Sequence, residues 1–474
     1  MQNPASGCQG LFNHVPQVRT GPKVTGERTP IPVIGGGWAG CAAALALARA
    51  GHRVALYEAA ATLGGRARRV VRDGLPLDNG QHLLLGAYAE TRRSIELAHD
   101  GAAPLPLIER SFALVPLSRT QGNALTLRAR ALPSPFDLAA GLLLAHELTW
   151  RERLAALRWF TGLRKRAYRC AQGATVAELL APLPPRVAAR LWSPLCVAAL
   201  NTAPERASAQ MFANVLRAVF DGEPGAGAIL APALDLGALF PDAVARWLEA
   251  RGHAVHLRAE ARIGCPRDGA FTLTAGAVQI DAPAMIVAVG PHQLARVFDA
   301  DSVAAPGVAH AVEQVERLAW EPIVTTYLGY AGVVALPAGL VRLDDAPGQW
   351  VFDRGDILMR AASGAPSLAS LLAVVISASG AHETLRRDAL VAAIDAQLRR
   401  LLPVLPALKW SQVITERRAT YSCAPQSARP AAGRLANGLY LAGDYTDQEF
   451  PATLEAAVRS GHIAAAQLSN DLPP

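Results

Sequence analysis

A glycine-rich turn near the start of the chain constrains the fold more than any other feature. Gly35, Gly37 and Gly40 have the spacing G-x-G-x-x-G, follow a short apolar run that predicts a strand, and precede an Ala/Leu-rich segment that predicts a helix. A second predicted strand ends next to Glu58, 18 residues past Gly40. This order predicts a β-α-β unit that binds a dinucleotide. The predicted strand, helix and strand cover residues 31–34, 38–50 and 52–57.

Each residue of this turn has a physical role in holding a pyrophosphate. Gly35 permits the tight turn, Gly37 lets the backbone approach the phosphates, and Gly40 lets the helix and the strand pack closely. Trp38 and Ala39 begin the helix, whose unpaired N–H groups and positive dipole end attract anions. These residues are therefore candidate cofactor ligands.

The residues that follow point to a flavin rather than a nicotinamide. Glu58 can accept hydrogen bonds from both hydroxyls of the adenosine ribose, and its charge would repel the 2′-phosphate of NADP. Gly64, Gly65 and Arg66 follow six to eight residues later and predict a second loop over the pyrophosphate, with Arg66 paired to a phosphate oxygen. Nicotinamide dehydrogenases lack this second loop, so the sequence predicts FAD.

A segment near the other end of the chain is predicted to contact the flavin. A buried strand ends in Gly443 and Asp444, and Asp444 is predicted to hold the ribityl hydroxyls. Pro451 suits the first turn of the next helix, whose N-terminus is predicted to face the pyrimidine edge of the flavin. Thr453 and Leu454 of this segment are further predicted cofactor contacts. By itself, Gly-Asp after a strand is a common turn. It becomes specific together with the N-terminal motif.

The pattern along the chain predicts an α/β protein with α+β insertions and two domains, because 474 residues exceed what one hydrophobic core usually serves. Residues 1–29 are expected to be a disordered leader. A Rossmann-like FAD-binding domain is predicted from residues 30–100, 226–300 and 433–474. An inserted substrate-binding domain is predicted from residues 101–225, which are mostly helical, and 301–432, which are mixed.

Composition argues against several other functions. The net charge is +7, but the arginines are scattered and no nucleic-acid-binding motif is present, so no nucleic-acid partner is predicted. The six cysteines show no C-x-x-C pair and no ligand-like spacing with histidines, which argues against a metal site. No stretch approaches the ~18 apolar residues of a membrane span, and no signal peptide is visible, so we predict a cytoplasmic protein.

Taken together, these residues resemble the flavin-containing amine oxidase and phytoene desaturase superfamily from Ile31 to about Leu468. Within it, the chain is most similar to the squalene-associated FAD-dependent desaturases, or hydroxysqualene dehydroxylases. The resemblance implies that reduced FAD converts hydroxysqualene to squalene and water, and that an apolar tunnel holds this C30 isoprenoid. It also implies cofactor contacts at Gly80 and Ala261. The segments that carry the resemblance are residues 78–88, 192–202, 442–446 and 451–455.

Replacing an allylic hydroxyl with hydrogen requires a hydride, supplied by the flavin, and a proton, because hydroxide is a poor leaving group. His82 is the predicted proton donor, since the segment from Asp78 to His82 runs beside the flavin in related proteins. Tyr445, directly after Asp444, is the rival donor. In the alternative interpretation, His82 only bonds the backbone of its own strand.

Other functions of the same fold stay open. A polyene desaturase would use the flavin in the oxidative direction, and an amine oxidase would require a polar substrate. A non-catalytic lipid-escort protein would have little need for Gly35, Glu58, Arg66 and Asp444. Cys423 lies in the region where some amine oxidases attach flavin covalently, but a buried free thiol is the favoured interpretation. We therefore predict noncovalent FAD.

The helical region 135–170 is predicted to contact the cytoplasmic membrane, so that a hydrocarbon can enter from the bilayer. The alternative is a core helix with solvated arginines. The predicted apolar anchors are Phe136, Leu138, Leu142, Leu143, Leu144, Trp150, Leu154, Trp159 and Phe160. The predicted basic cluster is Arg151, Arg153, Arg158, Arg164, Lys165, Arg166 and Arg169. The sequence indicates neither the electron donor nor the oligomeric state.

Overall fold

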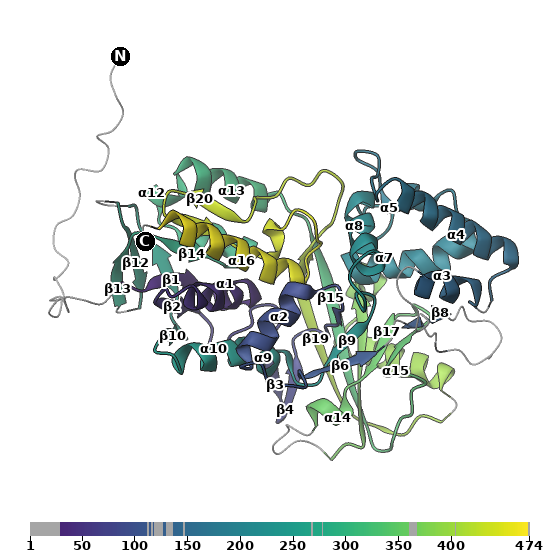
Figure 1. Ribbon diagram of the computed structural model, residues 1–474. Coiled ribbons are helices and arrows are strands. Elements are labelled where there is room, and N and C mark those ends of the chain that lie inside the picture. Colours follow the sequence, from purple (N-terminus) through teal and green to yellow (C-terminus); the bar gives the residue numbers. More distant parts are fainter. Residues whose placement is uncertain are drawn as a thin grey trace.

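A six-stranded sheet joins strands from three distant parts of the chain (Figure 1). Five strands are parallel, and β20 at one edge is antiparallel to its neighbour β21. The strand order is β10 (Ala254–His256), β2 (Val54–Tyr57), β1 (Ile31–Ile34), β14 (Met285–Val287), β21 (Leu439–Leu441) and β20 (Gly433–Ala436). The carboxyl ends of the parallel strands meet at one edge of the sheet, where ligands of such folds bind.

This computed structural model describes residues 29–110, 113–114, 117, 127–128, 136–145, 147–266, 269–276, 278–359, 367–402 and 404–472. Almost all of the predicted leader thus lies outside the described residues. Within them, no helix is both long enough and apolar enough to cross a membrane.

Pro32 lies in the central strand β1, although proline cannot donate to a sheet ladder. Ile31 and Gly35 donate their N–H groups to Arg53 and Tyr57 on the β2 side. Residue 32 therefore points its nitrogen toward β14, whose pairing with β1 begins only at Val33. The missing N–H group thus precedes the first residue of β1 that pairs with β14.

Helices pack closely on the parallel sheet because small residues line their contact. The helices α1 and α16 approach so closely that a Cβ at Gly461 would lie 2.3 Å from the carbonyl oxygen of Ala39. Figure 1 shows α16 lying along α1, with α2 and α10 beside them. Their bounds are α1 (Trp38–Arg49), α2 (Ala89–Ala98), α10 (Pro241–Glu249) and α16 (Leu454–Asp471).

A second, five-stranded antiparallel sheet forms the other main part of the structure. The sequence predicted this region only as a mixture of helices and strands. One face packs against α15 (Arg387–Leu401), which buries Leu390, Ile394 and Leu398 at helical spacing. The opposite face packs Tyr327 against Leu75. The strand order is β16 (Leu340–Arg342), β17 (Trp350–Asp353), β18 (Ser370–Ser377), β15 (Trp320–Tyr330) and β19 (Leu408–Tyr421).

A helical region lies at the end of the molecule away from the parallel sheet (Figure 1). Thr149 and Glu152 cap the start of α4 reciprocally, since the Glu152 N–H donates to the Thr149 hydroxyl and the Thr149 N–H to the Glu152 carboxylate. The helices are α3 (Phe136–Leu143), α4 (Trp150–Lys165), α5 (Val176–Leu180), α6 (Pro185–Val187), α7 (Ser193–Leu200) and α8 (Ala209–Phe220), with a π-helical turn over Ala188–Trp192.

The segment 253–263, which the sequence predicts to be one strand, is not a single element. It divides into β10 and β11 (Ala261–Ile263), which belong to different sheets. Between them Arg258 has a φ of +54°, and the N–H groups of Arg258 and Ala259 bond the carbonyl groups of Ala60 and Glu58. Strand β11 continues into a meander with β12 (Phe271–Ala275) and β13 (Val278–Ala282).

Smaller strands connect the main parts of the chain. A hairpin of β3 (Arg69–Arg72) and β4 (Leu75–Asp78) follows the second glycine loop. Strand β9 (Ile229–Pro232) pairs with both β5 (Leu84–Leu85) and β6 (Leu107–Arg110). Strand β6 of the predicted substrate domain thus shares a sheet with strands of the predicted FAD domain.

Candidate functional site

The first glycine turn leaves space at the N-terminus of α1. At Gly35, with a φ of +103°, a Cβ would lie 2.5 Å from the Ala288 carbonyl oxygen, and at Gly40 it would lie 1.8 Å from that of Gly35. At Gly37, the nearest atom of the described residues, apart from the two chain neighbours, would be the Cα of Gly65 at 4.0 Å. Protein packing therefore requires glycine at 35 and 40, whereas at 37 the absent side chain leaves an open cradle.

The second glycine loop lies against the first. The Gly64 N–H donates to the Gly36 carbonyl oxygen at 2.8 Å, and Gly37 and Gly64 form an isolated parallel bridge. The indole N–H of the buried Trp38 donates to the Ala67 carbonyl oxygen at 3.0 Å, which fastens this loop to α1. The two loops thus meet glycine against glycine, which fits close approach by a pyrophosphate.

The carboxylate of Glu58 lies at the same turn. Its Oε2 accepts from the Gly36 N–H at 2.7 Å, and its Oε1 accepts from the Ala60 N–H at 2.8 Å. The Glu58 carbonyl oxygen accepts from the N–H of Ala259, two residues before Ala261. Ala261 is buried as the first residue of β11. The structure therefore brings these two predicted cofactor contacts close together.

The C-terminal loop is fastened to α16. The Gly443 N–H donates to the Ser460 hydroxyl at 2.9 Å, and that hydroxyl donates to the Ala457 carbonyl oxygen at 2.6 Å. Thr453 caps α16 by accepting from the Ala456 N–H at 3.1 Å, and Leu454 is buried beside it. The N-terminus of α16 is thereby held next to the strand that ends in Asp444.

Arg66 links the two ends of the chain. Its guanidinium forms an ion pair with Asp444 and donates to the Ala419 carbonyl oxygen at 2.8 Å. The sequence predicted separate contacts for these side chains, Arg66 with a phosphate and Asp444 with the ribityl chain. The structure joins them, although 378 residues separate them. An ion pair at this position can orient both groups toward one ligand.

The imidazole of His82 is hydrogen-bonded within its own segment. Its Nδ1–H donates to the Gly80 carbonyl oxygen at 2.7 Å, so the neutral ring presents Nε2 as an acceptor. Burial lowers its pKa, as does the nearby charge of Arg66, while the bond to Gly80 acts in the opposite direction. The predicted bond to its own segment is thus present.

Tyr445 lies in the interior, fully shielded from solvent. Its hydroxyl donates to the Val289 carbonyl oxygen at 3.3 Å. Burial raises its pKa, and the charge of Asp444 raises it further. A proton held this tightly and already shared with a carbonyl group is poorly suited to acid catalysis.

Two charged residues near this segment were not identified from the sequence. Glu416 of β19 accepts from the amide of Asn79 at 3.1 Å, and Asn79 also donates to the Arg66 carbonyl oxygen at 3.3 Å. Arg354 forms an ion pair with the buried Asp78 at 3.2 Å. Both contacts join positions more than 270 residues apart, so no local pattern could indicate them.

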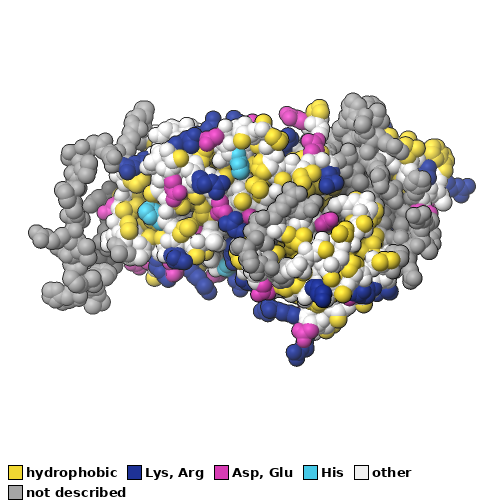
Figure 2. Space-filling view, turned by 90° about the horizontal axis from the view of Figure 1, so that it is seen from below, with side chains coloured by type: hydrophobic (Ala, Val, Ile, Leu, Met, Phe, Trp, Pro, Cys, Tyr) yellow, Lys and Arg dark blue, Asp and Glu magenta, His cyan; other side chains and the backbone are white. Residues whose placement is uncertain are grey.

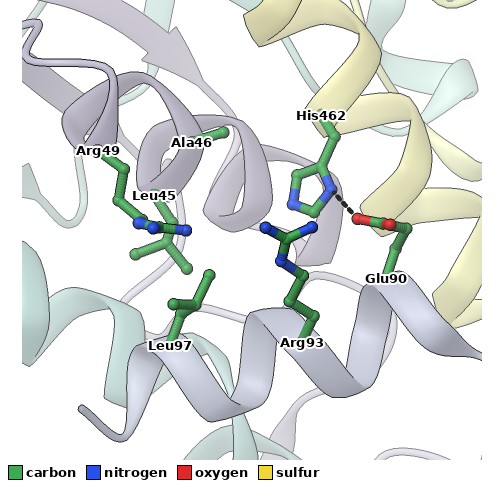
Figure 3. A pocket seen from close by; sticks show the side chains of 7 residues that line it. All are labelled: Leu45, Ala46, Arg49, Glu90, Arg93, Leu97 and His462. Atoms are coloured by element: carbon green, nitrogen blue, oxygen red, sulfur yellow. Dashed lines mark hydrogen bonds and ion pairs between the residues drawn. The ribbon is translucent and has the colours of Figure 1, made fainter. Parts of the chain in front are cut away.

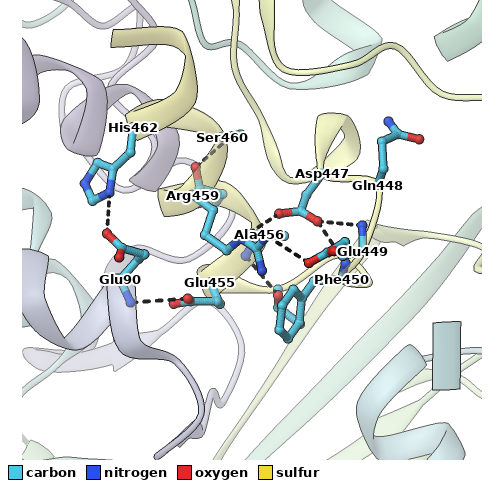
Figure 4. A network of polar contacts seen from close by, with 12 residues as sticks. Glu90, Asp447, Gln448, Glu449, Phe450, Glu455, Ala456, Arg459, Ser460 and His462 are labelled. Atoms are coloured by element: carbon cyan, nitrogen blue, oxygen red, sulfur yellow. Dashed lines mark hydrogen bonds and ion pairs between the residues drawn. The ribbon is translucent and has the colours of Figure 1, made fainter. Parts of the chain in front are cut away.

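A polar network explains why the last family segment contains Glu455 (Figure 4). Its carboxylate accepts from the N–H groups of Glu90 and Thr91 at 3.2 and 2.9 Å, which caps α2. Arg459, one turn later, pairs with Asp447 at 3.2 Å. The network therefore positions the loop before α16 and the start of α2.

A pocket of about 200 Å³ between α1, α2 and α16 is separate from these loops (Figure 3). The His462 ring faces it and pairs with Glu90 at 2.8 Å. The lining residues are Leu45, Ala46, Arg49, Glu90, Arg93, Leu97 and His462. None of the predicted cofactor residues contributes to it.

Cys423 is 2% exposed, and its backbone N–H donates to the Thr202 hydroxyl at 3.0 Å. Burial raises the pKa of its thiol to about 12, so the thiolate required for nucleophilic attack is scarce at neutral pH. This favours noncovalent FAD. Among the described residues, no group of three His, Cys, Asp or Glu side chains could hold a metal ion.

The membrane anchors predicted in region 135–170 are largely wrong. Leu142 and Phe160 are buried in the core, and the Trp159 indole donates to the Leu179 carbonyl oxygen. Helical periodicity turns one face of α4 inward, as the alternative interpretation stated. Leu144 and Trp150 are exposed, at 53% and 60%. The side chains of Phe136 and Leu138 lie outside the described residues, and Leu143 and Leu154 are partly buried.

The basic cluster is only partly available to a membrane. Arg153 donates to the Leu143 and Leu148 carbonyl oxygens, and Arg164 pairs with Asp221 at 2.8 Å. Figure 2 shows Lys and Arg side chains distributed over the face in view among acidic ones, rather than in one stripe. The exposed cations of the cluster also include Arg151, Arg158, Lys165, Arg166 and Arg169.

Comparison with known proteins identifies the family. A family model described as flavin-containing amine oxidoreductase matches residues 38–469. The chain belongs to this family. It is therefore an oxidoreductase with FAD as its cofactor, and the open cradle at Gly37 fits that group.

Relatives and solved structures agree with this assignment. A hydroxysqualene dehydroxylase from Rhodopseudomonas palustris is 30% identical over 92% of this chain and 97% of its own length. A 15-cis-phytoene desaturase from Glycine max is 25% identical over 93% of this chain and 79% of its own. An oxidoreductase from Methanosarcina mazei, 16% identical, has a TM-score of 0.70 over 93% of this chain and 100% of its own. The predicted resemblance and the α/β fold class are confirmed.

Proposed function

We propose that this chain is a hydroxysqualene dehydroxylase, which replaces the allylic hydroxyl of hydroxysqualene with hydrogen to give squalene and water, as a step of hopanoid biosynthesis. The similarity to the Rhodopseudomonas palustris protein along nearly the whole length of both chains supports this most strongly. The four family segments are all present, and each contains residues with an identifiable structural role. Reduced FAD would supply the hydride.

The protein's own residues would hold FAD at the carboxyl edge of the parallel sheet. We infer that the backbone at Gly37, Trp38 and Ala39 binds the phosphates, because this is where α1 begins and no side chain fills the cradle. The remaining proposed contacts are Gly35, Gly40, Glu58, Gly64, Gly65, Arg66, Gly80, Ala261, Gly443, Asp444, Thr453 and Leu454.

Between the two predicted proton donors, the geometry favours His82. A protonated ring would keep its Nδ1 bond to Gly80 and gain an Nε2–H to donate to the departing hydroxyl. Tyr445 has no such free hydrogen, because it donates to Val289. Since the pKa of His82 is lowered from its usual 6.5, the protonated form increases as the pH falls below that value.

The second candidate is a polyene desaturase, which the similarity to the Glycine max protein supports. It differs in the direction of electron flow, since desaturation would reduce FAD. Anaerobic mixing separates the two functions. We expect reduced enzyme and hydroxysqualene to give oxidised flavin and squalene in equal amounts, measured by absorbance and lipid analysis. Bleaching of oxidised enzyme by a polyene, without any reaction of hydroxysqualene, would instead identify a desaturase.

His82→Gln is the companion variant for this assay. It keeps a polar side chain but cannot carry a proton, so general acid catalysis worth ~10²-fold or more should be lost while FAD stays bound. The wild-type rate should rise as pH falls below 6.5, and the variant should lack that rise. A normal rate in this variant would make His82 structural, with Tyr445→Phe as the next test.

We also propose peripheral contact with anionic membrane, now limited to Leu144, Trp150 and the exposed cations of α4. The wild type should float with anionic vesicles at low salt and be released at high salt. Replacing Leu144 and Trp150 with serine should reduce flotation severalfold. Val333 and Val404, 80% and 86% exposed elsewhere, provide the matched double serine control, which should float normally. Equal flotation of both variants would contradict the proposed anchors.

A further inference from the structure

Asp78 and Arg354 form the most deeply buried ion pair among the described residues. Their side chains are 0% and 3% exposed, and Nη2 of Arg354 lies 3.2 Å from Oδ2 of Asp78. Removing two charges from water costs several kcal/mol per ion in typical proteins, so such a pair is seldom better for stability than two apolar side chains. Global stability alone therefore gives no reason for charges at this position.

The pair joins three separate segments at one point. Arg354, which follows β17, also donates to the carbonyl oxygens of Pro232 and Leu234 at 2.9 and 3.4 Å. Asp78 accepts from the Leu236 N–H at 2.8 Å through its other carboxylate oxygen. The hydroxyl of the buried Tyr327, from the centre of the antiparallel sheet, donates to the Asp78 carbonyl oxygen at 2.9 Å. Both carboxylate oxygens and the backbone carbonyl oxygen of Asp78 are thus held by hydrogen bonds.

The position of Asp78 in the chain gives this clamp its importance. Asp78 is the last residue of β4, and residues 79–83 belong to no helix or strand. The direction in which they leave the hairpin therefore depends on what holds Asp78. The segment contains Gly80 and His82, which we place beside FAD, and Asn79, which bonds Glu416 and the carbonyl group of Arg66.

We propose that Arg354 is a positioning residue, which acts through Asp78 to fix the path of residues 79–82 beside the flavin. It would do so without contacting substrate or cofactor, since its described bonds are to Asp78 and to two backbone carbonyl groups. This inference rests on the proposed location of FAD, but not on hydroxysqualene as the substrate. Arg354, which follows a strand of the antiparallel sheet, would thus help to position the residues around the flavin.

The test uses FAD-loaded protein and reads the flavin itself. Arg354→Met keeps the length of the side chain but removes its charge and hydrogen bonds. We expect the visible flavin spectrum to shift and the Kd for FAD to rise roughly tenfold. Arg354→Lys should restore the spectrum in part. Gln397→Leu is the control, since Gln397 is also fully buried and bonds the backbone of Gly348, but on the distant α15.

A pH titration of the spectrum supplies a second readout. Burial raises the pKa of Asp78 to about 6, although the charge of Arg354 lowers it. The nearby carboxylate of Asp235 raises this pKa further, and the neutral Tyr327 lies beside Asp78. Protonation should loosen the clamp, so the spectrum should change near pH 6. The titration is made in the His82→Gln background, because His82 also gains a proton below pH 6.5. The midpoint should be higher in Arg354→Met, and the change should be absent in Asp78→Asn.

Three outcomes would overturn the proposal. They are an unchanged spectrum and Kd in Arg354→Met with only a lower melting temperature, a spectral change of equal size in Gln397→Leu, or an unaltered pH titration in Asp78→Asn. If Arg354→Met fails to fold, Arg354→Lys and Asp78→Asn carry the test. If the wild type does not react with hydroxysqualene but the variants show the expected spectral shifts, the proposed function is wrong and this inference still holds.

Discussion

Gly37→Ala is expected to fold normally and to bind FAD about 10- to 100-fold more weakly than the wild type. The backbone conformation at this position, with φ of −73° and ψ of 178°, is accessible to any residue. Among the described residues, and apart from the two chain neighbours, the new methyl group would meet no atom closer than 4.0 Å. It would instead enter the cradle at the start of α1. Displacing a phosphate from charge-assisted hydrogen bonds there costs about 1.5–3 kcal/mol.

The matched control for this variant is Gly40→Ala, three residues further along α1. Its methyl group would lie 1.8 Å from the Gly35 carbonyl oxygen, so the helix would have to move from β1. We expect this variant to unfold more easily even without FAD, by about 1–3 kcal/mol. Urea unfolding of FAD-free protein and FAD titration separate the two effects. Equal destabilisation of both FAD-free variants would contradict a ligand-dependent role for Gly37.

The features predicted best from the sequence are formed by residues that lie close together along the chain. The strand, turn, helix and strand around Gly35 and Glu58 lie within about 30 consecutive residues, and each glycine there serves a local backbone need. Helix α1 was predicted over 38–50 and observed over Trp38–Arg49. The strand before Gly443 was likewise predicted because its apolar run is continuous, as in buried parallel strands.

The features that were missed depend on contacts between distant segments. Strand β15 reads as an apolar stretch, and nothing local indicates that it pairs with β18 and β19 some 45 and 90 residues later. A predicted strand is interrupted at Arg258 because the N–H groups of Arg258 and Ala259 bond the loop after β2. Amphipathic α4 could face either a membrane or a core, and only its packing partners decide which. Arg66 and Asp444 were each identified, but their ion pair was not.

The family segment around Asn201 shows how an identified motif gains its explanation only from the structure. Asn201 ends α7 with a φ of +48° and is buried. Its amide nitrogen lies 2.9–3.4 Å from three acceptors, and its amide oxygen accepts from the Ala378 N–H at 2.6 Å. The three acceptors are the Glu321 and Pro322 carbonyl oxygens and the Thr420 hydroxyl. One side chain therefore connects α7 to the ends of β15, β18 and β19.

Asn201→Ala is expected to lower the free energy of unfolding by about 3–5 kcal/mol, because several buried polar groups lose their partner at once. Alanine also retains the unfavourable left-handed backbone, so Asn201→Gly should be more stable than Asn201→Ala by about 1 kcal/mol, despite losing the same hydrogen bonds. Urea unfolding measures both differences. Thr161→Ala, an exposed position in the same helical region, is the control and should change stability by less than about 0.5 kcal/mol. If Asn201→Ala loses no more than this control, water replaces the amide in these contacts, and α7 is held to the antiparallel sheet by apolar packing alone.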